Sequence, residues 1–166
     1  MSAAFAAAAL AIAAPAAAFE REWHVGGRLG GAALKGAPVG LAVNVHGAYG
    51  LSDMFDAVVE VTGSRHGWSN GTDVFSASAG LAYKIDVLEW IPYVGLLAGY
   101  YHYAGTPGPN GEHGPAFGAA ISAGLDYLVS REFVLGVDLR AHMSFEDGFS
   151  FPYYTGLLGA EYRWGW

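Results

Sequence analysis

The sequence predicts an all-β protein: an eight-stranded antiparallel transmembrane β-barrel with up-and-down meander topology. Apolar and polar residues alternate with period two through eight successive segments, as expected when one face of each strand meets lipid and the other a lumen. Aromatic residues gather near both ends of these segments, where hydrocarbon meets water. No stretch beyond residue 18 reaches the length of a transmembrane helix, so a membrane protein with this sequence must close its strands into a barrel.

The composition narrows the class of protein. The 166 residues include 25 Gly, 14% are charged, and the formal net charge is -7, which is Gly-rich and charge-poor for a soluble domain. The length suits one domain, and the lack of a basic run argues against a nucleic-acid partner. Cys is absent, which excludes disulfides, thiolate metal sites and a lipidated amino-terminal Cys. Packing and strand pairing must therefore hold the fold together.

Residues 1–18 form an Ala-rich apolar stretch, which we interpret as a signal peptide. The stretch ends in Ala16-Ala17-Ala18, a small-x-small pattern that suits signal peptidase. It is too short and too weakly hydrophobic for a convincing transmembrane helix. No Lys or Arg precedes its apolar run, so a disordered Ala-rich leader is the alternative. Cleavage before Phe19 would deliver a barrel domain of residues 19–166 to the periplasm.

The first four strands show the alternation clearly. In the first, Trp23 and Leu29 lie on the face opposite to His24 and Arg28. The same pattern predicts strands at 23–34, 39–51, 55–62 and 73–85. Short turns follow the second and fourth strands, whereas the segment 63–72 has loop chemistry throughout.

The fifth strand, predicted at 90–103, is the exception because both of its faces are apolar. Val94 is no more apolar than Tyr93 and Leu97, so periodicity alone would allow a fully buried strand here. The segment 104–115 that follows is rich in Gly and Pro and predicts a long loop.

Alternation returns in the last three strands. They are predicted at 117–127, 133–145 and 153–166. In the seventh strand Val137 faces lipid and Asp138 the lumen. The eighth strand ends on aromatic residues and resembles the C-terminal assembly signal of bacterial outer-membrane barrels, formed here by Tyr162, Trp164 and Trp166. That resemblance implies recognition by the outer-membrane barrel assembly machinery.

The connections and the aromatic residues predict how the barrel lies in the membrane. Connections after the even strands are short, and two of those after the odd strands are long, which is typical of periplasmic turns and extracellular loops. One aromatic girdle is expected from Trp23, Tyr49, Phe55, Tyr83, Trp90, Tyr127, Phe133, Trp164 and Trp166. The other is expected from Phe75, Tyr101, Tyr103, Phe117, Phe145 and Tyr154.

Three segments of the sequence resemble a known family of proteins. W-I-P-Y-V-G-L-L-A-G-Y-Y (90–101), G-L-D-Y-L-V-S-R-E-F-V-L-G-V-D-L-R (124–140) and G-L-L-G-A-E-Y-R-W-G-W (156–166) resemble the strand-turn-strand repeats of the small OmpA/OmpX-type outer-membrane β-barrel proteins. The resemblance implies a monomer in the outer membrane of a Gram-negative bacterium, in contact with membrane lipids and lipopolysaccharide. It identifies an architecture shared by proteins of many roles. A soluble lipocalin-like barrel is the structural alternative.

A polar network is predicted inside the barrel. An eight-stranded barrel is only wide enough for side chains to fill it, so inward charges should pair with one another. The predicted network comprises Arg28, Asn44, Asp56, Glu60, Lys84, Asp126, Asp138, Arg140, Glu161 and Arg163. Arg28, Glu161, Arg140 and Asp138 come from strands that become neighbours on closure. The network is interpreted as a structural plug, with a narrow gated ion path as the alternative.

Catalytic chemistry has one weak signal. His142-Met143-Ser144 is similar to the His and Ser of outer-membrane lipid A deacylases, but it lies on the inward face, and Glu146 is too close in sequence for a third member. The prediction is therefore a non-enzyme without cofactor, with a lipid A-modifying hydrolase as a second alternative.

Two further sets of residues bear on binding. The histidines assigned inward, His24, His46, His102 and His142, show no metal-ligand spacing, so no metal is predicted. The segments 65–68 and 110–113 are possible loop surfaces for lipopolysaccharide or a partner, although Gly, Pro and polar residues at loop tips usually form only solvated turns.

Overall fold

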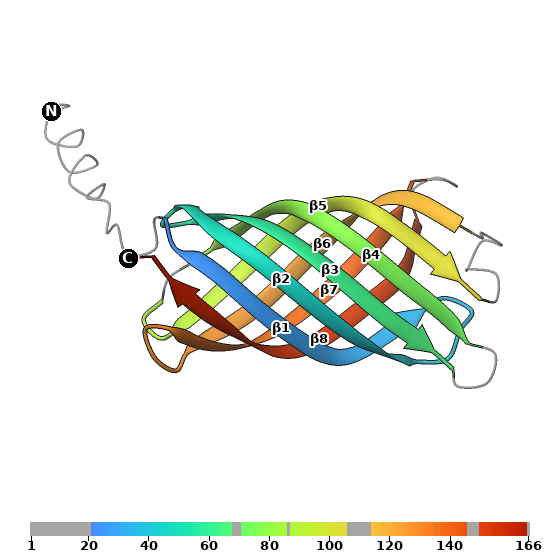
Figure 1. Ribbon diagram of the computed structural model, residues 1–166, viewed down its shortest axis with the longest axis horizontal. Helices are drawn as coiled ribbons and strands as arrows, with labels where there is room; N and C mark the ends of the chain where they lie inside the picture. The colour runs from blue at the N-terminus through green and yellow to red at the C-terminus, as the bar shows by residue number, and fades with distance from the viewer. Residues whose placement is uncertain (1–20, 68–70, 86, 106–113, 146–149, 166) are drawn as a thin grey trace, which may run out of the picture.

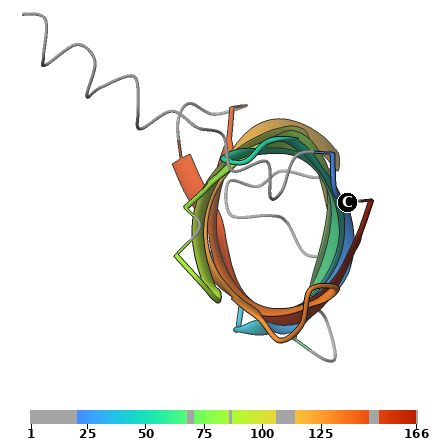
Figure 2. The same ribbon diagram turned by 90° about the vertical axis from the view of Figure 1, so that its left-hand side faces the viewer.

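The strands of the described residues form a closed β-barrel. The computed structural model describes residues 21–67, 71–85, 87–105, 114–145 and 150–165. Its strands are β1 (Trp23–Leu34), β2 (Gly40–Ser52), β3 (Phe55–His66), β4 (Thr72–Lys84), β5 (Trp90–Ala104), β6 (Gly114–Leu128), β7 (Phe133–Ser144) and β8 (Ser150–Trp164). Each strand pairs antiparallel with the next, and β8 pairs with β1, which closes the ring seen end-on in Figure 2. The eight-stranded meander predicted from the sequence is confirmed. No helix among these residues is long and apolar enough to cross a membrane.

The barrel has two distinct ends. We call the end that carries the connections after β2, β4 and β6 the turn end, and the opposite end the loop end. β1 begins and β8 ends at the turn end, where Trp23 is opposite Trp164 in the register. A serine hydroxyl stabilises two of the turns there by accepting hydrogen bonds from two backbone N–H groups. Ser52 Oγ accepts from Met54 and Phe55, and Ser130 Oγ accepts from Glu132 and Phe133.

The outer face is apolar, because the residues that the alternation assigns to lipid point away from the lumen. Val43 and Leu139 are exposed, for example, while their neighbours Asn44 and Arg140 are buried. An exposed hydrocarbon face of this extent is stable only in a membrane, and it excludes the lipocalin-like alternative, whose apolar residues would point inward.

An aromatic girdle surrounds the turn end. Ring pairs join neighbouring strands at centroid distances of 4.7 to 5.2 Å: Trp23–Tyr49, Phe55–Tyr83, Trp90–Tyr127 and Phe133–Tyr162. Aromatic pairs at such distances stabilise the strands that they join, and they mark an interface between hydrocarbon and water.

The loop end differs from the sequence prediction, because three strands begin or end beyond the predicted limits. β3 continues through 63–66, where Arg65 pairs in register with Asp73. β6 begins at Gly114 and β8 at Ser150. Since β3 ends at His66 and β4 begins at Thr72, the connection between them is only 67–71. Gly, Pro and polar residues in these extensions are typical of loops, yet the backbone ladder continues through them beyond the apolar band.

The fifth strand also corrects the prediction. Trp90 and Val94 point outward, so the odd-numbered residues of β5 face the lumen. Tyr101 and Tyr103 are therefore buried inside the barrel and do not belong to the loop-end girdle, and His102 points outward. Both faces of this strand are apolar, so its composition could not identify the inward side.

Candidate functional site

The lumen is the candidate site, because the polar side chains of the protein gather there. All ten residues of the predicted network lie on the inward face. Nine are buried, and Arg28 is partly buried. Among the nine charged members, four are cations and five are carboxylates, so the interior is close to electrical balance.

At mid-height Arg140 connects opposite walls of the barrel. Its guanidinium on β7 pairs with Asp138 on the same strand and with Glu60 on β3. On the β3 side, Asn44 Nδ2 donates hydrogen bonds to Thr62 Oγ1 (2.8 Å) and to Glu60 Oε2 (3.4 Å). We call Asn44, Glu60, Thr62, Asp138 and Arg140 the crosspiece. A buried charge in this arrangement has the partners that it requires.

A tyrosine extends the crosspiece to a third side of the lumen. Tyr93 on β5 donates its hydroxyl hydrogen to Asp138 Oδ2 at 2.6 Å. Arg28 stacks over the ring of Tyr93, with its Cζ 6.0 Å from the ring centroid. The sequence placed Arg28 beside Glu161, Arg140 and Asp138 because their strands adjoin. The structure pairs Arg28 with the tyrosine instead, since in a barrel this narrow a long side chain reaches across the lumen.

A second cluster lies nearer the turn end, around Glu161 on β8. The carboxylate accepts hydrogen bonds from His24 Nδ1 (3.1 Å), His46 Nε2 (2.9 Å) and Arg163 Nε (2.9 Å). Arg163 also lies 3.8 Å from Asp126. This cluster joins β8 to β1 and β2 across the seam where the barrel closes. The two histidines, which appeared scattered in the sequence, meet on one carboxylate.

Two more carboxylates complete the turn-end cluster. Lys84 Nζ pairs with Asp56 Oδ1 at 2.8 Å. Glu22, just before β1, lies 3.6 Å from His24 Nε2 and is buried. Burial raises the pKa of Glu22 above its usual value, and the nearby positive charges, His24 foremost, oppose this rise.

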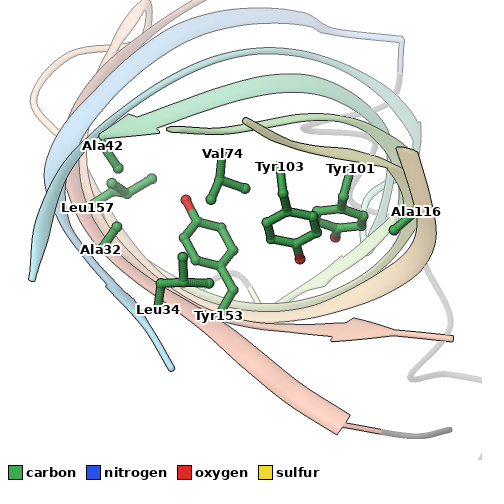
Figure 3. Close-up of a cluster of buried hydrophobic side chains, with 9 residues drawn as sticks. All are labelled: Ala32, Leu34, Ala42, Val74, Tyr101, Tyr103, Ala116, Tyr153 and Leu157. Atoms are coloured by element: carbon green, nitrogen blue, oxygen red, sulfur yellow. The ribbon is translucent and has the colours of Figure 1, made fainter. Parts of the chain in front are cut away.

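The loop end of the lumen is filled by tyrosines and aliphatic side chains, shown in Figure 3. The buried cluster comprises Ala32, Leu34, Ala42, Val74, Tyr101, Tyr103, Ala116, Tyr153 and Leu157. Tyr153 donates its hydroxyl hydrogen to Ser64 Oγ (2.9 Å), which lies 3.1 Å from His66 Nε2. Sequence reasoning missed this cluster. The parity of β8, in which Thr155 and Glu161 face inward, could have placed Tyr153 there.

Inward glycines make room for the largest lumen residues. A Cβ on Gly124 would collide with the ring of Tyr93, and one on Gly159 would collide with Arg28. His46 lies over Gly26 in the same way. Glycine in a strand commonly marks such a close approach. We call these glycines the shelves; they account for part of the Gly-rich composition.

A small cavity remains among the charged side chains. Its volume is about 50 Å³, and its lining includes Arg28, Asp56, Glu60, Tyr93, Arg140 and Glu161. This space can hold a few water molecules, which would supply hydrogen bonds to the buried polar atoms around it.

His142 and Ser144 both point into the lumen and are buried. The ring nitrogens of His142 lie 3.1 Å from the Tyr101 hydroxyl and 3.4 Å from Thr155 Oγ1. Within the described part of the chain, the hydrogen-bond partners of this ring are thus hydroxyl groups and not a carboxylate. Glu146 lies outside the described residues.

Two other sequence expectations concern metals and loops. The described ranges contain no group of three or more His, Asp or Glu residues that could hold a metal ion. The assignment of 65–68 to a loop is wrong for Arg65 and His66, although the Arg65 side chain is exposed. Arg65 and His66 belong to β3, and the His66 ring is buried with Nδ1 donating to the Pro38 carbonyl oxygen (3.1 Å). Trp68 and the segment 110–113 lie outside the described residues.

Comparison with solved structures supports the fold. Neisserial surface protein A (NspA) superposes with a TM-score of 0.64 at 17% identity, covering 86% of this chain and 94% of the other. The outer membrane protein OprG from Pseudomonas aeruginosa gives 0.65 at 11% identity, with 89% and 97% covered. The outer membrane enzyme PagL gives 0.52 at 12% identity, with 86% and 99% covered. No family model and no curated protein matches the sequence. At these identities the likeness establishes the fold, which is that of the small outer-membrane barrels of Gram-negative bacteria.

Proposed function

We propose that the protein is a non-conducting outer-membrane barrel with a structural or surface-interaction role, whose lumen is plugged by its own side chains. The observation that carries this proposal is the crosspiece, in which Arg140 joins Glu60 and Asp138 between opposite walls. The tyrosine cluster around Tyr101 and Tyr153 fills the loop end above it. With the interior occupied in this way, function falls to the outer surface and the loops.

The partners in this proposal follow from the barrel's position in the membrane. Membrane lipids contact the apolar face, and lipopolysaccharide contacts the loop end. The barrel assembly machinery would recognise the terminal strand through Tyr162, Trp164 and Trp166, the last of which lies outside the described residues. The stacked rings of Tyr162 and Trp164, 5.8 Å apart, provide an aromatic surface for this contact.

Conductance in planar lipid bilayers tests the plug. We expect the purified protein to give no steady conductance steps, because the crosspiece and the tyrosine cluster obstruct the lumen. The conductance of a Glu60→Gln variant is measured for comparison with the wild type. This variant keeps a polar side chain at position 60 but loses one charge of the crosspiece. Steady steps from the wild type that vanish in an Arg140 or Glu161 variant would contradict the plug and favour a gated ion path.

The narrow pore is the second candidate, and the cavity of about 50 Å³ among charged side chains is the observation in its favour. A chain of water molecules through this cavity would have charged groups along its course. The pore requires the crosspiece to open, whereas the plug requires it to stay formed, so the conductance measurement separates the two.

Lipid hydrolysis is the third candidate, since PagL is an enzyme on the same fold. We expect no fatty acid release when the purified protein is incubated with lipopolysaccharide, because His142 and Ser144 are buried in the lumen away from lipid. Mass spectrometry of the lipid would detect release. Release that disappears in a Ser144→Ala variant would establish the hydrolase instead.

A further inference from the structure

Two neighbouring connections at the turn end carry exposed aliphatic side chains. In the β2–β3 connection and its flank these are Leu51 and Met54, and in the β4–β5 connection they are Ile85, Val87 and Leu88. We call these five residues the rim patch. Turns of a barrel that end in water would be expected to carry polar residues, so the rim patch needs an explanation.

The two connections form one surface. The N–H of Lys84 donates to the carbonyl oxygen of Met54 at 2.9 Å, and the Tyr83 hydroxyl lies 3.7 Å from Met54 Sδ. The rim patch is also continuous with the lipid-facing girdle, since the ring of Tyr83 packs against that of Phe55, the residue after Met54, with a centroid distance of 5.2 Å. The apolar face of the barrel therefore extends further on the β2–β5 side than the girdle alone indicates.

The opposite side of the turn end is polar. The β6–β7 connection contains the exposed residues Ser130, Arg131 and Glu132, with Val129 as its aliphatic member. Before β1, Arg21 is exposed as well. The turn end is thus asymmetric, with an aliphatic side over β2 to β5 and a charged side over β6, β7 and the start of β1.

Leu88 stands out within the rim patch. It is 85% exposed, and its φ of 61° lies in the left-handed region. Val87 and Trp90 exchange backbone hydrogen bonds of 3.1 and 3.2 Å, which makes Leu88 the first central residue of a two-residue hairpin turn. Glycine is favoured where that residue has positive φ, because a Cβ there crowds the backbone. A strained leucine without packing inside the protein suggests that its side chain contacts something outside it.

We propose that the rim patch inserts into the interfacial layer of the membrane leaflet at the turn end, so that the β2–β5 side of the barrel sits deeper than the β6–β7 side. Continuity with the lipid-facing girdle identifies lipid as the occupant. The lipid would be a zwitterionic phospholipid. The two connections carry no Lys or Arg, and Asp53 and Glu89 beside the patch would repel anionic headgroups. The barrel axis is therefore tilted relative to the membrane normal, with the β2–β5 side deeper in the membrane than the β6–β7 side.

The lack of cysteine makes a direct test possible. A single spin label is attached in a Leu88→Cys variant and, as the matched control on the charged side, in an Arg131→Cys variant. Both barrels are reconstituted into vesicles of phosphatidylethanolamine and phosphatidylcholine. Collisions with oxygen report contact with lipid, and collisions with a nickel chelate report contact with water. We expect the label at 88 to be several-fold less accessible to nickel than the label at 131, and more accessible to oxygen. Equal nickel accessibility at the two sites would overturn the proposal.

A second measurement tests whether the side chain of Leu88, and not the conformation of its turn, holds the rim patch in the membrane. In a Met54→Cys protein, a label on the neighbouring connection reports depth with Leu88 present or replaced by Gly. Leu88→Gly suits the backbone of the turn, so the barrel should fold normally, and the label at 54 should become more accessible to nickel. An unchanged depth would contradict anchoring by Leu88. A label at 88 that is shielded from both reagents only in native outer-membrane fragments would show that a protein covers the patch, which also overturns the proposal.

Discussion

Replacing Arg140 by Met is expected to lower the free energy of unfolding by about 3 to 5 kcal/mol, the cost of leaving buried charges without their partner. Met keeps most of the aliphatic stem but removes the guanidinium, so Glu60 and Asp138 would face each other in the lumen without a cation. Urea titration of the protein folded in lipid vesicles, followed by tryptophan fluorescence, measures the change.

The control removes the charges together. A triple variant with Arg140→Met, Glu60→Gln and Asp138→Asn leaves no unpaired charge in the crosspiece, and it should recover much of the lost stability. If the single variant costs only about 1 kcal/mol or less, as an exposed ion pair would, the crosspiece does not hold the opposite walls together. The proposal of a plugged lumen would then lose the observation on which it mainly rests.

Val137→Arg is expected to cost about 2 to 4 kcal/mol, the range for a basic residue at the midplane of the lipid face. Val137 is exposed on β7, between Leu125 on β6 and Leu158 on β8 in the register, four residues after the strand begins and seven before it ends. The same urea titration measures the loss, and the heat-dependent gel mobility of the variant shows whether it assembles.

Phe133→Arg is the matched control, because Phe133 lies on the same face of the same strand but in the turn-end girdle. At that depth the arginine itself should cost only about 0 to 1 kcal/mol, and a Phe133→Ala variant measures separately the loss of the ring pair with Tyr162. Leu125→Arg should repeat the large loss seen at Val137. Equal, small losses at all three positions would mean that the outward face does not lie in hydrocarbon, against the membrane assignment.

The membrane fold was predictable because a strand in lipid follows a simple physical rule. In β7, Leu135, Val137 and Leu139 face lipid and are each followed by a residue that faces the lumen, as the alternation predicts. The rule fails at the loop end, where the wall of the barrel continues into water. There Ser64 and Arg65 lack the hydrocarbon face that would reveal a strand, so β3 looked shorter than it is.

The inward faces were predictable where the alternation was clear, but the partners inside the lumen were not. Because β1 and β8 are adjacent in the closed barrel, the sequence suggested pairs such as Arg28 with Glu161. The pairs that form also depend on side-chain length and on the space left by glycines. Arg140 reaches Glu60 on the far wall for this reason. In β5, with two apolar faces, only the register with its neighbours identifies the inward tyrosines.

The glycine shelves also determine where this barrel could be engineered into a channel. Tyr93 covers Gly124, so truncating Tyr93 to Ala would leave a gap that the glycine has no side chain to fill. The same gap would reach Arg28, which would lose the ring that it stacks on. Widening could therefore proceed locally, one shelf at a time, without altering the strand number or the lipid face.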